Sequence, residues 1–314
     1  MKYLTDKLGG RFFDDPKVML NFYEKIKNDE FDHRIFSVSA IGCSTNNLLH
    51  IFNFLVDKKL DVPLKKEVIF TLLNYFNQTH QDLMDNLFDG RQRKRVKKDI
   101  GDIMNNLNKI VYYNERVGNE DVLYASILQY GEILSSKILH HFLNFLGCEN
   151  NLLDARKYVL MDKIRDGNII LIKPSFVDAI RDKKITIISG FIGKSGTNSS
   201  IGKFNSSDDS LAFFSTTLFG DLKDVIIATF WKDFPGVGVE NPSEIEEEYV
   251  EFLPKITANS YLKLIETIGS YPVKPEAIIC FKEKIHPKSR SKVFVKSYKE
   301  PEKIGTEIVF NGKS

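Results

Sequence analysis

Apolar residues in the first half of the chain recur at two different spacings. Residues 34–41 read RIFSVSAI and end in the polar stretch GCSTN, which is typical of a buried strand that leads through a loop into a helix. From about residue 47 to residue 144 the spacing is helical, in LLHIFNFLV, in VIFTLLNYF and, after a polar linker, in VLYASILQYGEILSSKILHHFLNFL. This pattern predicts a helical segment packed against a sheet.

After Gly147 the pattern changes to short β-rich runs separated by polar turns. The runs are NLLDARKYV, NIILIK, KITIISGFIG, DVIIATFW and KVFVKSY, with helical stretches at 210–219 and 260–270 between them. Strands that alternate with helices predict an α/β fold with a mainly parallel sheet covered on both faces. Ligands bind such sheets beyond the carboxyl ends of the strands, so the loops after the strands are the candidate sites.

Composition excludes several classes of partner. The 314 residues carry 44 basic and 42 acidic side chains, and this balance favours neither nucleic acid nor a membrane surface as a partner. No apolar run has the length of a signal peptide or a membrane span, so we expect a cytoplasmic protein. The three cysteines form no CxxC pair, and no histidine lies near them at ligand spacing, so we expect neither a disulfide framework nor a metal site made by the chain itself.

The basic run GRQRKRVKK at residues 90–98 could bind an anionic partner. Single charge runs are common on solvated helix faces and loops, so we assign this one no function.

Two loops in the first half contain residue types that bind phosphate. Lys7 precedes Gly9 and Gly10, whose backbone N–H groups could approach phosphate oxygens, although a turn beside a surface lysine explains the same residues. Residues 39–46 read SAIGCSTN and open a helix, where free N–H groups favour an anion. A simple N-cap by Ser44 or Thr45 explains this second loop about equally well.

Two further segments carry candidate charges. Glu132 follows a glycine on an otherwise apolar helical face and could bind the ammonium group of an amino acid, or it is an exposed helix glutamate. The long loop at residues 190–209 contains Lys203, Ser207 and Asp208 before an apolar helix. An N-cap explains Ser207 and Asp208, but it explains neither the lysine nor the length of the loop.

Taken in order, these segments resemble the aspartate kinase branch of the amino-acid kinase family over nearly the whole chain. The most specific segment is WKDFPGVGVENP at residues 231–242, which resembles Trp-Thr-Asp-Val-Asp-Gly-Val-Tyr-Thr-Thr-Asp-Pro. Further matches are residues 7–10 with Lys-Phe-Gly-Gly, 39–46 with the Ser-Ala-Met-Gly loop, 131–135 with Gly-Glu-x-Leu-Ser, 153–156 with Leu-Asp-Ala-Arg, 285–287 with Val-Leu-His-Pro, and 295–306 with the last strand and its Gly-Thr.

The resemblance implies a three-layer α/β/α sandwich that forms one domain over residues 1–314. An acceptor lobe would span residues 1–220, with a helical insertion at about 57–120, and a nucleotide-binding lobe would span residues 221–314. The implied reaction transfers the γ-phosphoryl group of ATP, with Mg2+, to the β-carboxylate of L-aspartate and gives 4-phospho-aspartate. Pairing into a homodimer is implied as well, and we expect no regulatory ACT domains because the chain ends shortly after the last strand.

The resemblance also implies roles for individual residues. Lys7 would stabilise the transferring phosphoryl group, Asp208 would organise the cluster around it, and Glu132 would hold the substrate ammonium. The remaining implied residues contact the two substrates: Thr45, Lys203 and Ser207 bind the acceptor, and Gly9, Gly10, Trp231, Lys232, Asp233, Val237 and Pro242 bind the nucleotide.

Three departures from the family pattern fall near the substrates. Arg11 stands where the family has Thr or Ser, and Lys203 stands where a family arginine clamps the substrate carboxylate. The polar residues Thr5 and Asp6 weaken the strand that leads into Lys7. Two alternatives to an aspartate kinase therefore stay open: a kinase of this fold for another small carboxylate, and a catalytically inactive binding or assembly protein.

Overall fold

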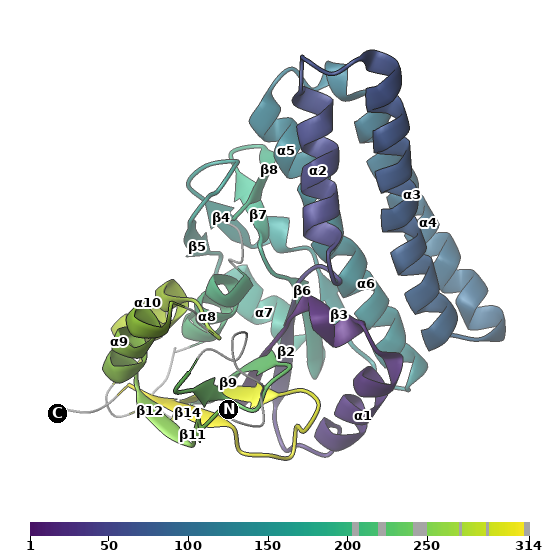
Figure 1. The fold of residues 1–314 in the computed structure, drawn as a ribbon. Helices are drawn as coiled ribbons and strands as arrows, with labels where there is room; N and C mark the ends of the chain where they lie inside the picture. Colours follow the sequence, from purple (N-terminus) through teal and green to yellow (C-terminus); the bar gives the residue numbers. More distant parts are fainter. Residues whose placement is uncertain (203–206, 219–223, 241–249, 270–271, 287–288, 311–314) are drawn as a thin grey trace.

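The computed structural model describes residues 1–202, 207–218, 224–240, 250–269, 272–286 and 289–310, and its centre is an eight-stranded sheet (Figure 1). Neighbouring strands are parallel except β13 and β14. The prediction of a mainly parallel α/β sheet is therefore confirmed. The strand order is β12 (Lys255–Thr257), β14 (Thr306–Val309), β13 (Lys292–Ser297), β9 (Val225–Lys232), β1 (Lys2–Leu8), β2 (His33–Val38), β6 (Ile185–Ser189) and β3 (Asn151–Leu153).

Strand β1 lies in the middle of this sheet although its sequence is a poor strand pattern. The two polar residues that weaken the pattern are both buried and hydrogen-bonded. The Thr5 hydroxyl lies 2.7 Å from the Ser215 hydroxyl, and the Asp6 carboxylate accepts hydrogen bonds of 2.7 Å each from Trp231 Nε1 and Arg34 Nε. Partners far along the chain thus satisfy groups that would otherwise destabilise a buried strand.

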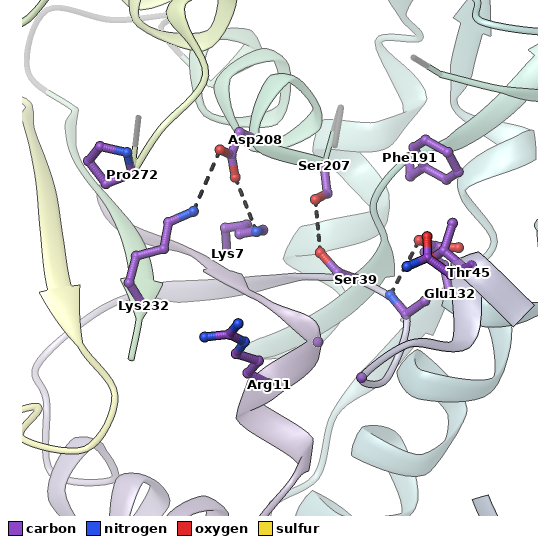
Figure 2. Close-up of a pocket in the computed structure, with 14 residues that line it drawn as sticks. Lys7, Arg11, Ser39, Thr45, Glu132, Phe191, Ser207, Asp208, Lys232 and Pro272 are labelled. Carbon is purple, nitrogen blue, oxygen red and sulfur yellow. Dashed lines mark hydrogen bonds and ion pairs between the residues drawn. The ribbon is translucent and has the colours of Figure 1, made fainter. Parts of the chain in front are cut away.

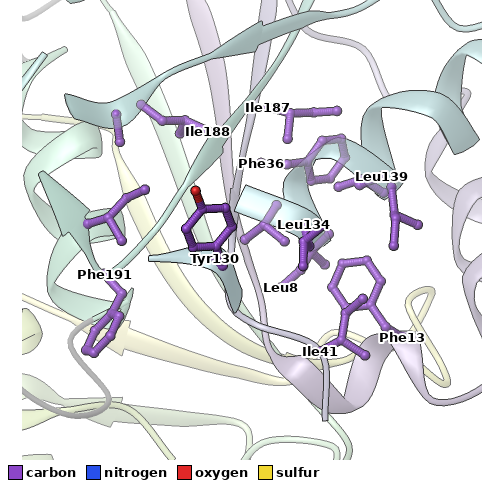
Figure 3. Packing of buried hydrophobic residues seen from close by; sticks show 14 of the residues in the cluster. Leu8, Phe13, Phe36, Ile41, Tyr130, Leu134, Leu139, Ile187, Ile188 and Phe191 are labelled. Carbon is purple, nitrogen blue, oxygen red and sulfur yellow. The ribbon is translucent and has the colours of Figure 1, made fainter. Parts of the chain in front are cut away.

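Helices cover both faces of the sheet and complete the expected three layers (Figure 1). The first face holds α1 (Pro16–Ile26) and α6 (Tyr130–Phe145), and Leu134 and Leu139 of α6 lie against Phe36 and Ile187 of the sheet in Figure 3. On the opposite face α8 (Ser207–Thr217) packs on β1 and β9, with α7 (Ser175–Arg181), α10 (Pro275–Lys284) and α9 (Ala258–Ile268) beside it. The sheet is therefore buried between two helical layers.

A group of helices projects from the sheet between β2 and α6 (Figure 1). It consists of α2 (Ser44–Val56), α3 (Val62–Leu87), α4 (Gly90–Tyr112), the short 3-10 helix η2 (Asn114–Arg116) and α5 (Glu120–Leu128). The expected polar linker is wrong here, because α4 is a helix of 23 residues that buries one narrow stripe: Val96, Ile100, Met104, Leu107 and Val111. The basic run lies in the first turns of α4. No helix in the described ranges is long and apolar enough to cross a membrane.

Two smaller sheets lie outside the main one. A four-stranded sheet joins β5 (Ile169–Ile172), β4 (Val159–Met161), β7 (Ile192–Ser195) and β8 (Asn198–Ile201), so the predicted strand NIILIK forms but does not enter the central sheet. A second pair joins β10 (Val237–Gly238) to β11 (Phe252–Leu253). Two more 3-10 turns, η1 (Gly10–Phe13) and η3 (Ala155–Lys157), follow β1 and β3.

Candidate active site

A cavity of about 330 Å³ opens where β1, β2 and β9 end (Figure 2). Its position beyond the carboxyl ends of parallel strands agrees with the expectation from the strand and helix pattern. The lining residues come from loops and helix starts far apart along the chain: Lys7, Gly10, Arg11, Ser39, Ala40, Gly42, Thr45, Asn46, Glu132, Phe191, Ser207, Asp208, Lys232 and Pro272.

The Asp208 carboxylate lies between two lysines at this cavity (Figure 2). Lys7, near the end of β1, places its Nζ 3.2 Å from Asp208 Oδ1, and Lys232, the last residue of β9, places its Nζ 3.7 Å from Oδ2. Asp208 lies in the first turn of α8, where the helix dipole also favours a negative charge. All three side chains are buried or nearly so, and two positive charges face one negative charge.

Burial and charge oppose each other in this cluster. Burial alone would raise the pKa of Asp208, but the ammonium groups of Lys232 and Lys7 and the N–H of Lys274 outweigh it and lower that pKa. Burial lowers the pKa of Lys232 to about 8, and the Asp208 carboxylate offsets only part of this effect. The carboxylate is therefore held ionised between the lysines, and Lys232 stays mostly protonated near neutral pH.

A second buried pair supports this cluster from behind. Lys274 Nζ lies 3.5 Å from Asp209 Oδ2, and the Lys274 backbone N–H donates to Asp208 Oδ2 at 3.1 Å. Burial raises the pKa of Asp209 to about 6 in spite of Lys274. The start of α10 is thereby fastened to the start of α8.

Glu132 lies at the other end of the cavity, in the first turn of α6. The neighbouring Gly131 allows this close approach, since a Cβ there would lie 2.7 Å from the Cβ of Ala40. Glu132 Oε1 accepts a hydrogen bond of 3.3 Å from the Ala40 N–H, whereas its buried Oε2 has no hydrogen-bond partner in the described structure. Burial raises the pKa of Glu132 to about 8. This unsatisfied oxygen suits a cationic or hydrogen-bond-donating ligand.

Short contacts join the loops that carry these residues. The Ser39 hydroxyl donates to the Ser207 hydroxyl at 2.8 Å, which connects the loop after β2 to the start of α8. Gly10 packs so closely under the same loop that a Cβ on it would lie 2.3 Å from the carbonyl oxygen of Ala40. Phe191 has a positive φ of 65° and lines the cavity next to Ser207. The cavity walls are therefore held together by direct contacts.

The structure brings most of the expected site residues to one cavity. Those that line it are Lys7, Gly10, Thr45, Glu132, Ser207, Asp208 and Lys232. Lys203 and Pro242 lie outside the described residues. Gly9, Trp231, Asp233 and Val237 were expected in the nucleotide pocket but do not line this cavity.

Trp231 and Val237 do not line the cavity and contact other parts of the fold. Because side chains alternate along β9, the Trp231 indole points to the opposite face of the sheet, where it donates to Asp6 and packs against Phe22 and Lys296. Val237 is buried, and its backbone N–H donates to the Thr306 hydroxyl at 2.8 Å. Both residues thus hold up the strand and the turn that carry Lys232 and Asp233.

Sequence reasoning did not assign a site role to Arg11, Phe191 or Pro272, which also line the cavity. Phe191 lies in the loop at residues 190–209, which is one of the candidate segments named from the sequence, so the sequence did point to this region. Pro272 carried no such signal, because the packing of α10 on α8, which brings its segment to the cavity, links parts of the chain that are far apart in the sequence. Arg11 stood out only as a departure from a family pattern.

Comparison with known proteins identifies relatives of this arrangement. A sequence profile described as "Amino acid kinase family" matches residues 6–288. The chain is 23% identical over 247 residues to the bifunctional aspartokinase/homoserine dehydrogenase 2 of Escherichia coli (strain K12), and 23% identical over 210 residues to an aspartokinase of Chlamydia pneumoniae. These matches cover 77% and 66% of this chain but only 28% and 45% of the two relatives.

Solved structures give the same result for the fold. E. coli aspartokinase III in complex with aspartate and ADP superposes with a TM-score of 0.81 at 17% identity, over 99% of this chain and 65% of that chain. Clostridium acetobutylicum aspartate kinase superposes with a TM-score of 0.71 at 18% identity, over 99% of this chain and 64% of that chain. At these identities the likeness establishes a shared fold.

Proposed function

This chain belongs to the amino acid kinase family, and from that premise we propose that it transfers the γ-phosphoryl group of ATP to a carboxylate of a small amino acid, with L-aspartate as the first candidate. The observation that carries the proposal is the Asp208 carboxylate between Lys7 and Lys232 at the cavity. Aspartate is the first candidate because the solved E. coli aspartokinase III is a complex with aspartate and ADP.

The two lysines are placed to stabilise a transferring phosphoryl group. Phosphoryl transfer develops negative charge on the equatorial and leaving oxygens, so catalysis depends on positioning and on preorganised positive charge. Lys7 and Lys232 approach the cavity from neighbouring parallel strands, and Asp208 holds both ammonium groups in place. Gly10 lets the turn after Lys7 pack directly against the loop after β2, because a Cβ there would lie 2.3 Å from the Ala40 carbonyl oxygen.

The acceptor would bind between Glu132 and the phosphoryl group. The unsatisfied Oε2 of Glu132 would accept from the substrate ammonium, and Thr45 and Ser207 line the same cavity. Lys203, which lies outside the described residues, is proposed to bind the substrate carboxylate. Binding at these points would direct the second carboxylate of the acceptor towards Lys7.

The proposed step balances without a proton transfer. An oxygen of the acceptor carboxylate, already ionised, forms a bond to the γ-phosphorus as the bond from that phosphorus to the β,γ-bridging oxygen breaks. The products are an acyl phosphate and ADP. Mg2+ enters with ATP as part of the substrate, since this ion is usually held by phosphates and one or two carboxylates.

The nucleotide would extend from the lysines along the segment after β9. Lys232 and Asp233 lie at the start of this segment. A Cβ on Gly9 would lie 3.6 Å from Lys7 Nζ, so the glycine turn borders the phosphate side. Val237 and Pro242, and the backbone next to Trp231, complete the proposed nucleotide pocket. The cytoplasm, which supplies ATP, is the proposed compartment, and a homodimer is the proposed assembly.

One observation favours a different acceptor. In the sequence, Lys203 stands where aspartate kinases have an arginine that clamps the substrate carboxylate, and an ammonium group cannot donate the same pair of parallel hydrogen bonds. A kinase of this fold for another small carboxylate is therefore the second candidate. An inactive binding protein is the third.

A coupled ADP-release assay with Mg-ATP tests these candidates, with L-aspartate compared against a panel of small carboxylates. We expect ADP release that needs both aspartate and Lys7, and loss of this release in Lys7→Ala. The matched control is Lys66→Ala, which removes an exposed lysine on α3 far from the cavity. ADP release with another carboxylate would identify that carboxylate as the acceptor, and the absence of ADP release with every acceptor would refute the catalytic proposal.

A further inference from the structure

Arg11 is held at the mouth of the cavity by the turn that contains it. The preceding Gly10 packs against the loop after β2, and the following residues, Phe12 and Phe13, are both buried. The 3-10 turn η1 is thus anchored on both sides of Arg11, whose own side chain is 76% exposed. The turn therefore places an exposed guanidinium at the same cavity as the two lysines of the site.

The guanidinium makes one ion pair within the described residues. Arg11 Nη1 lies 2.6 Å from Oδ2 of Asp233, which follows the last residue of β9 and is 222 positions away in the sequence. The pair therefore joins the glycine turn to the segment proposed to border the nucleotide. Exposed ion pairs contribute little to stability, so the guanidinium can leave Asp233 at small cost.

The direction of the side chain indicates which substrate it would meet. In Figure 2 the Arg11 guanidinium lies on the side of Lys232 and Lys7, away from Glu132 and Thr45. Three cationic side chains, Lys7, Lys232 and Arg11, line this part of the cavity and face two carboxylates, Asp208 and the Asp233 that pairs with Arg11. This excess of positive charge fits a polyphosphate better than a single carboxylate.

We propose that Arg11 binds the terminal phosphates of the nucleotide, and that Asp233 holds its side chain while the site contains no nucleotide. The inference rests on the proposed kinase function and adds a residue that the family pattern does not contain. A guanidinium is suited to this role because its planar fork can donate two parallel hydrogen bonds to phosphate oxygens, which an ammonium group cannot do.

Calorimetric titration of the whole chain with ATP, ADP and AMP tests the inference. We expect Arg11→Ala to weaken ATP and ADP binding by about 10- to 100-fold, the range for loss of a charge-assisted hydrogen bond, and to leave AMP binding unchanged. Arg11→Lys should fall between this variant and the wild type. The matched control, Arg91→Ala, removes an exposed arginine on α4 and should bind all three nucleotides as the wild type does.

The other outcomes separate the inference from the proposed function. If the wild type binds ATP and both Arg11 variants bind it equally well, the inference is overturned while the kinase proposal stands. The inference is also overturned if the Arg11 variants bind ATP as the wild type does but show a raised KM for the acceptor carboxylate. If the wild-type chain binds no nucleotide, the proposed function and the inference are both refuted. Because Arg11 is exposed, its substitution leaves the core intact, and circular dichroism checks this.

Discussion

The protonation of Glu132 provides a sharp test of the site. The side chain is buried, one of its oxygens has no partner in the described structure, and its pKa is raised to about 8. The carboxyl group of the free protein is therefore mostly neutral at pH 7. Glu132→Gln replaces it by an amide of the same shape that is always neutral and can keep the hydrogen bond from the Ala40 N–H.

The sign of the effect on stability follows from the raised pKa. In the unfolded chain the carboxyl ionises near its ordinary value of 4.5, whereas in the folded chain it stays protonated up to about pH 8. Stability from the neutral group is therefore complete below the unfolded pKa and is lost as the pH rises through the folded pKa. The change corresponds to about 5 kcal/mol as an upper limit, at about 1.4 kcal/mol per pH unit.

Urea unfolding of the wild type and Glu132→Gln at a series of pH values measures this difference. We expect the variant to gain stability over the wild type as the pH rises from about 5, and the gain to level off above about 8. Glu149→Gln is the control, because Glu149 is fully exposed and lies outside the cavity. A stability difference that does not depend on pH would refute the assignment of a neutral buried carboxyl group.

The same carboxyl group links acceptor binding to proton release. An ammonium group on the acceptor stabilises the ionised form of Glu132, so binding at pH 7 should release a proton, and the affinity should rise with pH until about 8. Calorimetric titration in two buffers of different ionisation enthalpy counts the proton. Binding of aspartate without proton release would mean that Glu132 does not contact the ammonium group.

Three further predictions concern the supports of the site. Lys232 has a pKa of about 8 in the protein without nucleotide, so kcat/KM should fall as the pH rises above this value, and Lys232→Met should lower kcat/KM and remove that limb of its pH profile. Gly10→Ala should destabilise the protein by about 1–3 kcal/mol in thermal unfolding, because the new Cβ would lie 2.3 Å from a backbone carbonyl oxygen. The control is Gly101→Ala on α4, whose Cβ would meet no atom within 4 Å, and this variant should be neutral or stabilising. Arg34→Met should cost about 3–5 kcal/mol in urea unfolding by leaving the Asp6 carboxylate buried without its guanidinium, and an unchanged midpoint would contradict that reasoning.

The sequence pattern predicted the strands that are apolar on both faces and missed elements whose signal is weaker. Continuous apolar runs predicted β2, β6 and β9 because helices cover both sides of the sheet, and the shorter β-rich run KVFVKSY predicted β13. Helix α4 was not predicted because it buries only about one residue per turn and is otherwise highly charged. A narrow apolar stripe of this kind is difficult to separate from a polar linker without knowing that α6 and α3 pack beside it.

The sequence predicted many of the residues of the candidate site but not the contacts between them. The residue types of Lys7, Asp208 and Glu132 pointed to phosphate and amino-acid chemistry, and the family resemblance gave them roles. No local pattern could show that Lys232 pairs with Asp208, or that Arg11 reaches Asp233, because these contacts depend on the pairing of β1 with β9. The sheet register decides them.

The polar residues that weaken β1 as a strand are connected with the position of the lysines. Side chains alternate along β1 and β9, so Asp6 and Trp231 point to one face while Lys7 and Lys232 point to the cavity. The buried hydrogen bond from Trp231 Nε1 to Asp6 therefore joins the two strands at the residues next to Lys7 and Lys232, on the opposite face of the sheet. An apolar residue in place of Asp6 could not accept this bond. The polar side chain of Asp6 therefore weakens β1 as a strand pattern and at the same time helps to fix the distance between the proposed catalytic lysines.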